Sequence, residues 1–391
     1  GAVYSYAVKR RSSLEEACAD LVNGCCAVVF DGPMAALTFE TRSQTGRGVS
    51  EPTVVKSIKG AKDAFVETLR VNTSLVRRKL RSPSLKLAEL TLGRESNTAV
   101  AVLYVEGVAK DATVQELLRR LRSIDTDGLL SAAEIEEALA DSPKTPFPQL
   151  LHTERSDAFA MQLLNGRVGV IADGLPLGFL APGCLPAFMR VPEDSASHFA
   201  VSPMLLALRW VALALSLLLP GAFVAVSMYH QEMLPTELLM SMSAAKQYVP
   251  FSSAAEVIAM LVSFELLQEA GLRLPDPVGQ TASIIGALIV GQSAVEARIV
   301  SPIAVIIVAL SGIAGYTLPS HDLSSAIRLL RFLFVIAGAA LGLYGLMTAL
   351  ALLIYHLSAL ESFGAPYLTP LTDADGRGAL RALLSRPVRA N

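Results

Sequence analysis

The sequence predicts two parts of different fold class, a cytoplasmic soluble α/β domain over residues 1–200 and a polytopic helical membrane domain over 201–360, followed by a cytoplasmic tail over 361–391. Residues 1–200 carry 23 Lys and Arg and 24 Asp and Glu, whereas residues 201–391 carry only 10 and 11. The chain as a whole is 52% hydrophobic, with a mean hydropathy of +0.48. An ordinary charge content followed by a strongly apolar half is typical of a soluble domain joined to membrane spans. The net charge of −2 gives no indication of nucleic-acid binding.

Two apolar hairpins organise the predicted α/β domain. Each consists of two strand-like runs joined by Asp-Gly, a strong hairpin signal. The expected elements are a helix at 13–23, a hairpin at 25–39 around Asp31-Gly32, a strand at 99–105, helices at 113–123 and 132–140, and a hairpin at 167–181 around Asp173-Gly174. If the hairpins belong to two copies of one α/β unit, the first copy lacks a leading strand and helix. We therefore expect the native protein to extend further toward the N-terminus.

Three uncharged runs in the second half, residues 210–231, 299–321 and 332–360, are long enough to cross a bilayer, which takes about 20 apolar residues. Pro220-Gly221 predicts a kink in the first run. Gly338, Gly342 and Gly345 in the third predict close approach of neighbouring helices.

Two further segments are ambiguous. Residues 249–268 are apolar but charged at two positions, and 277–295 are interrupted by glycines, as in re-entrant or broken helices. Four crossings result if one of them spans and the other is re-entrant. This places Arg328 and Arg331 on the outer side, against the excess of basic residues expected in the cytoplasm.

Polar residues inside apolar sequence are the candidate functional residues, because charge at membrane depth is costly and normally lines a water-filled path or an interface. We expect four of them near an ion pathway: Glu256, Gln280, Gln292 and Glu296. Three others share one helix face at i, i+4, i+8 and are expected to hold helices or subunits together: Glu265, Glu269 and Arg273. An interfacial helix with its charges among lipid headgroups is an equally good interpretation of these three.

Other motifs give little support for an enzyme or a metalloprotein. Residues 123–134 match a calcium loop at four positions, but the first ligand position holds Ser123, so ordinary turn chemistry is favoured. The four cysteines form no C-x-x-C pair and are interpreted as small buried hydrophobic residues. No nucleotide-binding loop, catalytic triad or metal constellation is recognisable. We expect no cofactor and no metal.

Several blocks, in order along residues 24–371, resemble the A-subunit family of spore germination receptors, the GerA type, which includes the AF protein of the stage V sporulation operon. In the soluble half they are Glu51-Pro52, Lys59-Gly60-Ala61-Lys62-Asp63-Ala64-Phe65, Asn72-Thr73-Ser74-Leu75-Val76-Arg77-Arg78, Tyr104-Val105-Glu106-Gly107, Ser142-Pro143 with Pro146-Phe147-Pro148-Gln149, and Thr153-Glu154-Arg155. In the membrane half they are Leu234-Pro235-Thr236-Glu237-Leu238-Leu239, Val249-Pro250-Phe251, residues 265–275, Val278-Gly279-Gln280, residues 283–297, Val300-Ser301-Pro302 and residues 362–368. The soluble half departs from the family pattern at Lys62-Asp63-Ala64, Ser156 and Ser195-Ala196-Ser197, which puts its partner contacts in doubt.

The resemblance implies a multi-pass protein of the inner membrane of dormant spores. It implies ring-shaped homo-oligomers, for example pentamers, that conduct monovalent cations when a nutrient is sensed. Its implied partners are a transporter-like B subunit that binds the nutrient and a lipoprotein C subunit. Membrane lipid is a further candidate partner for the basic clusters Lys56-Lys59-Lys62 and Arg77-Arg78-Lys79-Arg81, although solvated helix faces are the favoured interpretation of them, and no nucleic acid is expected. Two alternatives remain open: a secondary transporter for a small solute bound near residues 277–295, and a non-conducting scaffold for the transporter-like subunit.

Overall fold

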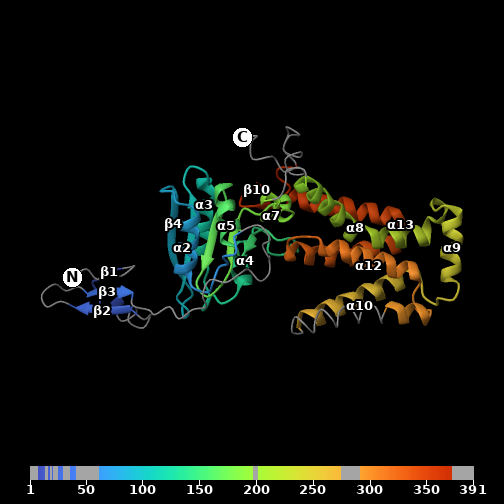
Figure 1. Ribbon diagram of the computed structural model, residues 1–391, viewed down its shortest axis with the longest axis horizontal. Helices are drawn as coiled ribbons and strands as arrows, with labels where there is room; N and C mark the ends of the chain where they lie inside the picture. Colours follow the sequence, from blue (N-terminus) through green and yellow to red (C-terminus); the bar gives the residue numbers. More distant parts are fainter. Residues whose placement is uncertain are drawn as a thin grey trace.

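The computed structural model describes residues 8–13, 16–17, 20, 25–29, 36–40, 61–196, 201–273 and 291–371. Over these ranges it contains an α/β domain, a bundle of long helices extending from one side of that domain, and a small N-terminal sheet (Figure 1). The predicted succession of an α/β part and a helical part is therefore confirmed.

The α/β domain is built on a five-stranded antiparallel sheet. Its strands are β4 (Leu85–Leu92), β5 (Thr98–Val105), β6 (Leu151–Thr153), β7 (Val168–Ala172) and β8 (Gly178–Ala181), in the order β4-β5-β7-β8-β6. The predicted second hairpin is confirmed, because β7 pairs with β8 in the register Val168↔Ala181. The predicted strand at 99–105 is β5, which pairs Val100 with Ala172 of β7.

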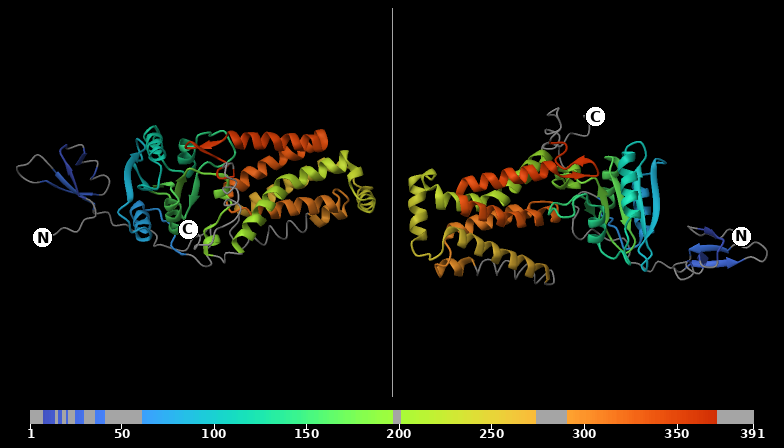
Figure 2. Two further views of the ribbon diagram at one scale, coloured as in Figure 1. Left: turned by 90° about the horizontal axis from the view of Figure 1, so that it is seen from above. Right: turned by 180° about the vertical axis from the view of Figure 1, so that it is seen from behind.

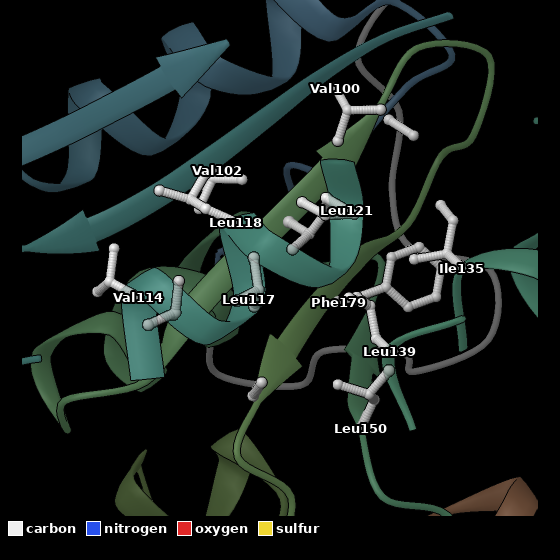
Figure 3. Close-up of a cluster of buried hydrophobic side chains, with 14 of the residues drawn as sticks. Val100, Val102, Val114, Leu117, Leu118, Leu121, Ile135, Leu139, Leu150 and Phe179 are labelled. Carbon is white, nitrogen blue, oxygen red and sulfur yellow. The ribbon is translucent and has the colours of Figure 1, made fainter. Parts of the chain in front are cut away.

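Helices cover both faces of this sheet and make a three-layer domain. One face packs against α3 (Asp111–Arg122) and α4 (Ala132–Leu139), and the other against α2 (Leu69–Lys79) and α5 (Ser156–Leu164). The strands alternate accordingly: Val100 and Val102 of β5 belong to the first core (Figure 3), and Ala101 and Leu103 to the second. Such alternation follows from the two-residue period of a strand with both faces buried. The predicted helices at 113–123 and 132–140 are confirmed as α3 and α4.

The second core contains a close aromatic contact. The rings of Phe65 and Phe159 meet edge to face with centroids 5.4 Å apart. Phe159 also lies over Gly169 of β7 and Gly178 of β8, where a Cβ atom would come within 2.1 and 2.7 Å of its ring. These positions admit only glycine while the ring stays in place.

The N-terminal sheet has the order β1-β3-β2, from β1 (Val8–Arg11), β2 (Cys25–Val29) and β3 (Ala36–Glu40). The first predicted hairpin is confirmed, with Val29 paired to Ala36. The strand order β1-β3-β2 matches the order β6-β8-β7 in the large sheet. The chain order also matches: a strand (β1 or β6), then helical residues (16, 17 and 20, or α5), then two paired strands (β2 and β3, or β7 and β8). This supports the repeated unit. The expectation that only a helix precedes the first hairpin is wrong, because β1 also precedes it, but β1 corresponds to β6, so the expected loss of a counterpart of β5 remains a prediction. The exposed Cys26 also contradicts the interpretation of the cysteines as uniformly buried.

The helical region begins after α6 (Leu185–Phe188) and α7 (Pro192–Ala196). It comprises α8 (Val201–Tyr229), η1 (Gln231–Met233), α9 (Thr236–Lys246), α10 (Ser253–Arg273), α12 (Pro302–Tyr316) and α13 (His321–Ala359), and ends in the short hairpin of β9 (Glu361–Ser362) and β10 (Ala365–Pro366). Of the described helices, α8 and α13 are long and apolar enough to cross a membrane. At 15 residues, α12 extends about 22 Å, less than the roughly 30 Å hydrocarbon core, so the span predicted at 299–321 is shorter than expected.

The run predicted as a single span at 332–360 is instead part of a reversal. Gly342 in α13 has φ 62° and ψ −143°, which lies outside the helical region and suits glycine. A Cβ atom on Gly345 would lie 2.2 Å from the carbonyl oxygen of Ala337, although eight residues of straight helix rise about 12 Å. The two arms, residues 321–341 and 343–359, therefore lie against each other, and both ends of α13 return to the α/β domain (Figure 2).

This reversal corrects the predicted position of two arginines. Arg328 and Arg331 lie seven and ten residues after His321 in the first arm, whose beginning contacts the α/β domain through Asp322. Both therefore lie within a helix of the bundle and not in the loop outside the bundle that the sequence analysis assumed.

The small residues predicted to allow close helix approach do so between α8 and α13. A Cβ atom on Gly338 would lie 2.6 Å from the carbonyl oxygen of Gly221, and one on Gly221 would lie 2.7 Å from that of Phe334. Helix α8 continues through Pro220, and the kink expected there remains a prediction. Of the ambiguous segments, 249–268 falls in α10, and most of 277–295 lies outside the described residues.

Candidate functional sites at the domain junction and in the helical region

The first candidate site is the junction where the β9–β10 hairpin packs against the α/β domain. The fully buried Ser362 hydroxyl donates to the carbonyl of Gln149 at 2.9 Å and accepts the N–H of Gly183 at 3.1 Å. The N–H of Leu185 donates to the carbonyl of Tyr367 at 2.8 Å. Residues 361–371 thus form part of the folded junction. The first part of the expected tail, which was predicted to begin at residue 361, is therefore packed against the α/β domain.

The proline-containing segment after α4 meets α13 at the same junction. The Thr145 hydroxyl lies 2.9 Å from Nε2 of His356, and the Phe147 ring lies 6.1 Å from the His356 ring and 6.2 Å from that of Tyr367. The Phe147 side chain is buried. This contact connects the soluble domain to the end of the second arm of α13.

A third contact joins the soluble domain to the first turn of α13. His152 Nδ1 lies 3.1 Å from Oδ2 of Asp322 and 3.8 Å from Oε1 of Glu136. The hydrogen bond to Asp322 raises the pKa of His152, although burial opposes the charged form. Burial raises the pKa of Glu136, and the nearby Asp322 carboxylate adds to the effect. The sequence analysis missed this cluster because its members are far apart in the chain.

Glu256, the residue first expected near an ion pathway, is buried inside the single chain with 1% exposure. Its Oε2 accepts the N–H of Ser301, the N-cap of α12, at 2.8 Å, and its Oε1 lies 3.6 Å from Nζ of Lys246 on α9. A carboxylate at a helix N-terminus satisfies an otherwise free amide. Glu256 therefore joins α10 to α12 within the chain, and its expected place near an ion pathway remains a prediction.

Among the residues expected to hold helices together, Glu265 does so within the chain. Its Oε2 lies 3.3 Å from Nη1 of Arg328 on α13, and Gln268 accepts from the same nitrogen at 2.8 Å. Glu269 also interacts with a partner. The Arg273 side chain lies outside the described residues. The predicted Glu269–Arg273 pair therefore remains a prediction.

The sequence analysis also missed a buried cation beside this contact. Arg331 is 1% exposed and donates from Nη2 to the Ser216 hydroxyl at 2.8 Å. Its Nε and Nη1 are buried without a hydrogen-bond partner in the described part of the chain. The bundle between α8, α12 and α13 therefore has a charged group in its interior.

The predicted i, i+4 relation of Gln292 and Glu296 is confirmed. The Gln292 amide donates to Oε1 of Glu296 at 2.8 Å, and both side chains are exposed on a helical turn at residues 291–296. Ser301 and Glu256 place the start of α12 beside the start of α10. Gln280 lies outside the described residues.

Three residues of the segment 123–134 that matches a calcium loop have partners within the chain. Asp125 pairs with Arg94 at 2.7 Å, and Glu134 accepts the N–H of Leu130 at 3.0 Å while Ser131 caps α4. Within the described ranges, the residues with metal-binding side chains converge at Glu136, His152 and Asp322 instead. The favoured interpretation of this loop as turn chemistry agrees with these contacts.

These features define a class of protein: an α/β domain connected at both ends of the reversed helix α13 to an apolar bundle that includes the membrane-length helix α8. Residues 2–390 match the family described as "Bacillus/Clostridium GerA spore germination protein". The chain belongs to the GerA family of spore germination proteins and is a homologue of germinant-receptor A subunits.

Three curated relatives come from Bacillus subtilis (strain 168). Spore germination protein KA is 38% identical over 380 residues, 97% of this chain and 70% of that protein. The uncharacterized membrane protein YfkQ is 37% identical over 365 residues, 93% of this chain and 71% of that protein. Spore germination protein A1 is 36% identical over 350 residues, 90% of this chain and 73% of that protein. Together with α8 and α13, the likeness to a membrane protein identifies this chain as a membrane protein.

A solved structure is also similar in sequence. It is the N-terminal domain of the A subunit of the Bacillus megaterium spore germinant receptor GerK3, with 32% identity over 45% of this chain and 62% of that chain, at a TM-score of 0.27.

Proposed function

We propose that this chain is the A subunit of a germinant receptor and forms a homo-oligomeric, ligand-gated channel that releases monovalent cations during germination. The observation that carries the proposal is the exposed Gln292–Glu296 pair, which lies a few residues before the apolar helix α12. An exposed carboxylate within a membrane region requires water or a polar neighbour. In a ring of subunits, Glu296 carboxylates would provide a hydrated, negatively charged path.

Helix α9 supports assembly into an oligomer. None of its residues is buried in the single chain, and Leu238 and Met240 are 46% and 68% exposed. Apolar side chains exposed together on one helix are typical of a surface that another chain or lipid covers. Figure 1 shows α9 at the end of the bundle far from the α/β domain, where neighbouring subunits would contact one another.

The domain junction supplies a route for gating. The soluble domain contacts α13 at Asp322 and at His356, the two ends of the reversed helix. A displacement of the soluble domain on binding a B-type or C-type partner would thus act on both arms. In this proposal, Glu265 and Glu269 stabilise helix contacts, as would Arg273, and Glu256 holds the α10–α12 connection. Gln280 remains a proposed pathway residue on sequence grounds.

Recording of single-channel currents tests this proposal. The full-length chain is reconstituted in planar bilayers, alone and with B-type and C-type partners, and compared with Glu296→Gln and with Glu237→Gln as a matched change on α9. A carboxylate about 5 Å from a cation in water contributes about 0.8 kcal/mol. Because every subunit loses one, Glu296→Gln should lower cation current several-fold, and Glu237→Gln much less. Silence of correctly assembled oligomers in every combination would refute the channel and favour the transporter or the scaffold.

A further inference from the structure

Three side chains from three separate elements converge at the junction. Glu136 comes from α4, His152 from β6 and Asp322 from the first turn of α13. One ligand atom from each lies within 4.8 Å of the other two, with His152 Nδ1 at 3.1 Å from Asp322 Oδ2 and 3.8 Å from Glu136 Oε1. The elements that supply them are separately anchored, so the convergence is set by the packing of the two domains.

These separations suit a transition-metal ion. Zinc bonds to His nitrogen and carboxylate oxygen at about 2.0–2.2 Å, so neighbouring ligands in a tetrahedral site lie roughly 3.3–3.5 Å apart. The two distances from His152 fall on either side of that range. Calcium and magnesium prefer all-oxygen sites with six or more ligands, whereas an imidazole nitrogen favours zinc and its neighbours.

The local charge also favours a divalent cation. The carboxylates of Glu136 and Asp322 both lie beside the single imidazole of His152. Two carboxylates with a neutral imidazole would leave two negative charges at the site, which a divalent ion neutralises. The ordinary alternative is a His ion pair with the same residues.

The cluster is open to solvent. The side chains of Glu136, His152 and Asp322 are 37%, 29% and 35% exposed. Glu136 and Asp322 both line a groove of about 430 Å³ between α4, the proline-containing segment and α13. An ion can therefore reach the ligand atoms, and water from the groove can complete the coordination.

We propose that Glu136, His152 and Asp322 form a binding site for Zn²⁺ or a similar divalent transition-metal ion that fastens the soluble domain to α13. Because two ligands belong to the soluble domain and one to the reversed helix, occupancy would favour the docked arrangement of the junction. This site goes beyond the proposed channel and does not depend on it.

Zinc binding by the full chain in nanodiscs tests the site. Bound Zn²⁺ per chain is measured by mass spectrometry after equilibrium dialysis, and affinity by calorimetry, for wild type, Asp322→Asn and His152→Gln. Glu137→Gln is the matched control, because it removes a carboxylate that lines the same groove. Loss of an outer-shell partner typically costs 10–100-fold in affinity, so loss of a ligand should cost about 100-fold or more. We expect one Zn²⁺ fewer per chain in both ligand variants and none lost in the control.

Thermal unfolding distinguishes loss of zinc binding from misfolding of a variant. Zn²⁺ should raise the unfolding temperature of the wild type and of Glu137→Gln but not of folded Asp322→Asn or His152→Gln. The difference in stoichiometry also separates this site from thiols such as the exposed Cys26, which every variant retains. Equal Zn²⁺ stoichiometry and affinity in wild type and both ligand variants would overturn the proposal, as would equal losses in the control.

Discussion

Substitution of Ser362 by alanine should loosen the domain junction without unfolding either domain. The Ser362 hydroxyl makes two buried hydrogen bonds, to the Gln149 carbonyl and from the Gly183 N–H. A buried hydrogen bond contributes about 0.5–1.5 kcal/mol net. Gly183 N–H also donates to the Gln149 carbonyl at 3.0 Å, so neither backbone group is left unpaired. We therefore expect the substitution to lower the free energy of opening the junction by about 1–2 kcal/mol, less than the upper limits for two hydrogen bonds together.

Hydrogen exchange measures this loss where it occurs. A loss of 1–2 kcal/mol changes an opening equilibrium by a factor of roughly 5–30. Peptides covering residues 361–371 should therefore exchange 5–30-fold faster in Ser362→Ala, while peptides from β5 and β7 exchange as in wild type. Ser358→Ala is the matched control, because the exposed Ser358 hydroxyl bonds only the carbonyl of Ile354 in its own helix among the described contacts. Wild-type exchange in Ser362→Ala, or equal acceleration in both variants, would refute the reasoning.

Three further outcomes are expected. Gly169→Ala should destabilise the α/β domain by about 1–3 kcal/mol in thermal or denaturant unfolding, because its new Cβ atom meets the Phe159 ring. Burial alone would raise the pKa of Asp157, but hydrogen bonding and attraction to Arg155 lower it below its usual value. The stability this gives is therefore present above the unfolded-state pKa and is lost as pH falls through the lower folded-state pKa, and Asp157→Asn should flatten that acid limb of the unfolding curve. Glu256→Gln, which keeps an acceptor for the N-cap amide of α12, should unfold closer to wild type than Glu256→Ala, which leaves that amide unpaired.

Each outcome can fail independently. Wild-type stability of Gly169→Ala would show that the aromatic ring moves aside at little cost. An acid limb unchanged in Asp157→Asn would assign the pH dependence to other carboxylates, such as Asp63, whose pKa is also lowered. Equal stability of the two Glu256 variants would show that the amide finds another acceptor.

The local elements with strong turn chemistry were predictable from the sequence. The Asp-Gly pairs at 31–32 and 173–174 predicted both hairpins, and the sequence pattern also predicted α3 and α4. Strand β4 was missed although Leu85, Leu87 and Leu90 partly alternate with polar residues, which is a usable signal for a strand with one covered face. Helices α2 and α5 were also missed.

The reversal in α13 could not be predicted from hydropathy. Residues 332–360 are uncharged and predominantly apolar, and the mean hydropathy of a window does not register a change of chain direction. The glycines were recognised as sites of close approach, but only the backbone of Gly342 shows which one reverses the chain. Non-local packing decides between a long helix and two antiparallel arms.

The candidate sites likewise differ in whether the sequence alone could predict their contacts. The Gln292–Glu296 pair depends on helical spacing, and the sequence contains it. The partners of Glu256 and Glu265 come from other helices, and the cluster around His152 joins residues from both domains. Such contacts arise only once the chain is folded, so one sequence gives no sign of them.

The measurement that tests the central claim most directly is the water accessibility of position 296 in a conducting channel. Glu296→Cys channels are recorded in planar bilayers before and after addition of a charged, membrane-impermeant thiol reagent, with the wild type as the control for the native cysteines. The account predicts that modification changes the unitary current of Glu296→Cys and leaves the wild type unaltered. An unchanged current, with mass spectrometry showing complete modification of the introduced thiol, would contradict a cation path that passes Glu296.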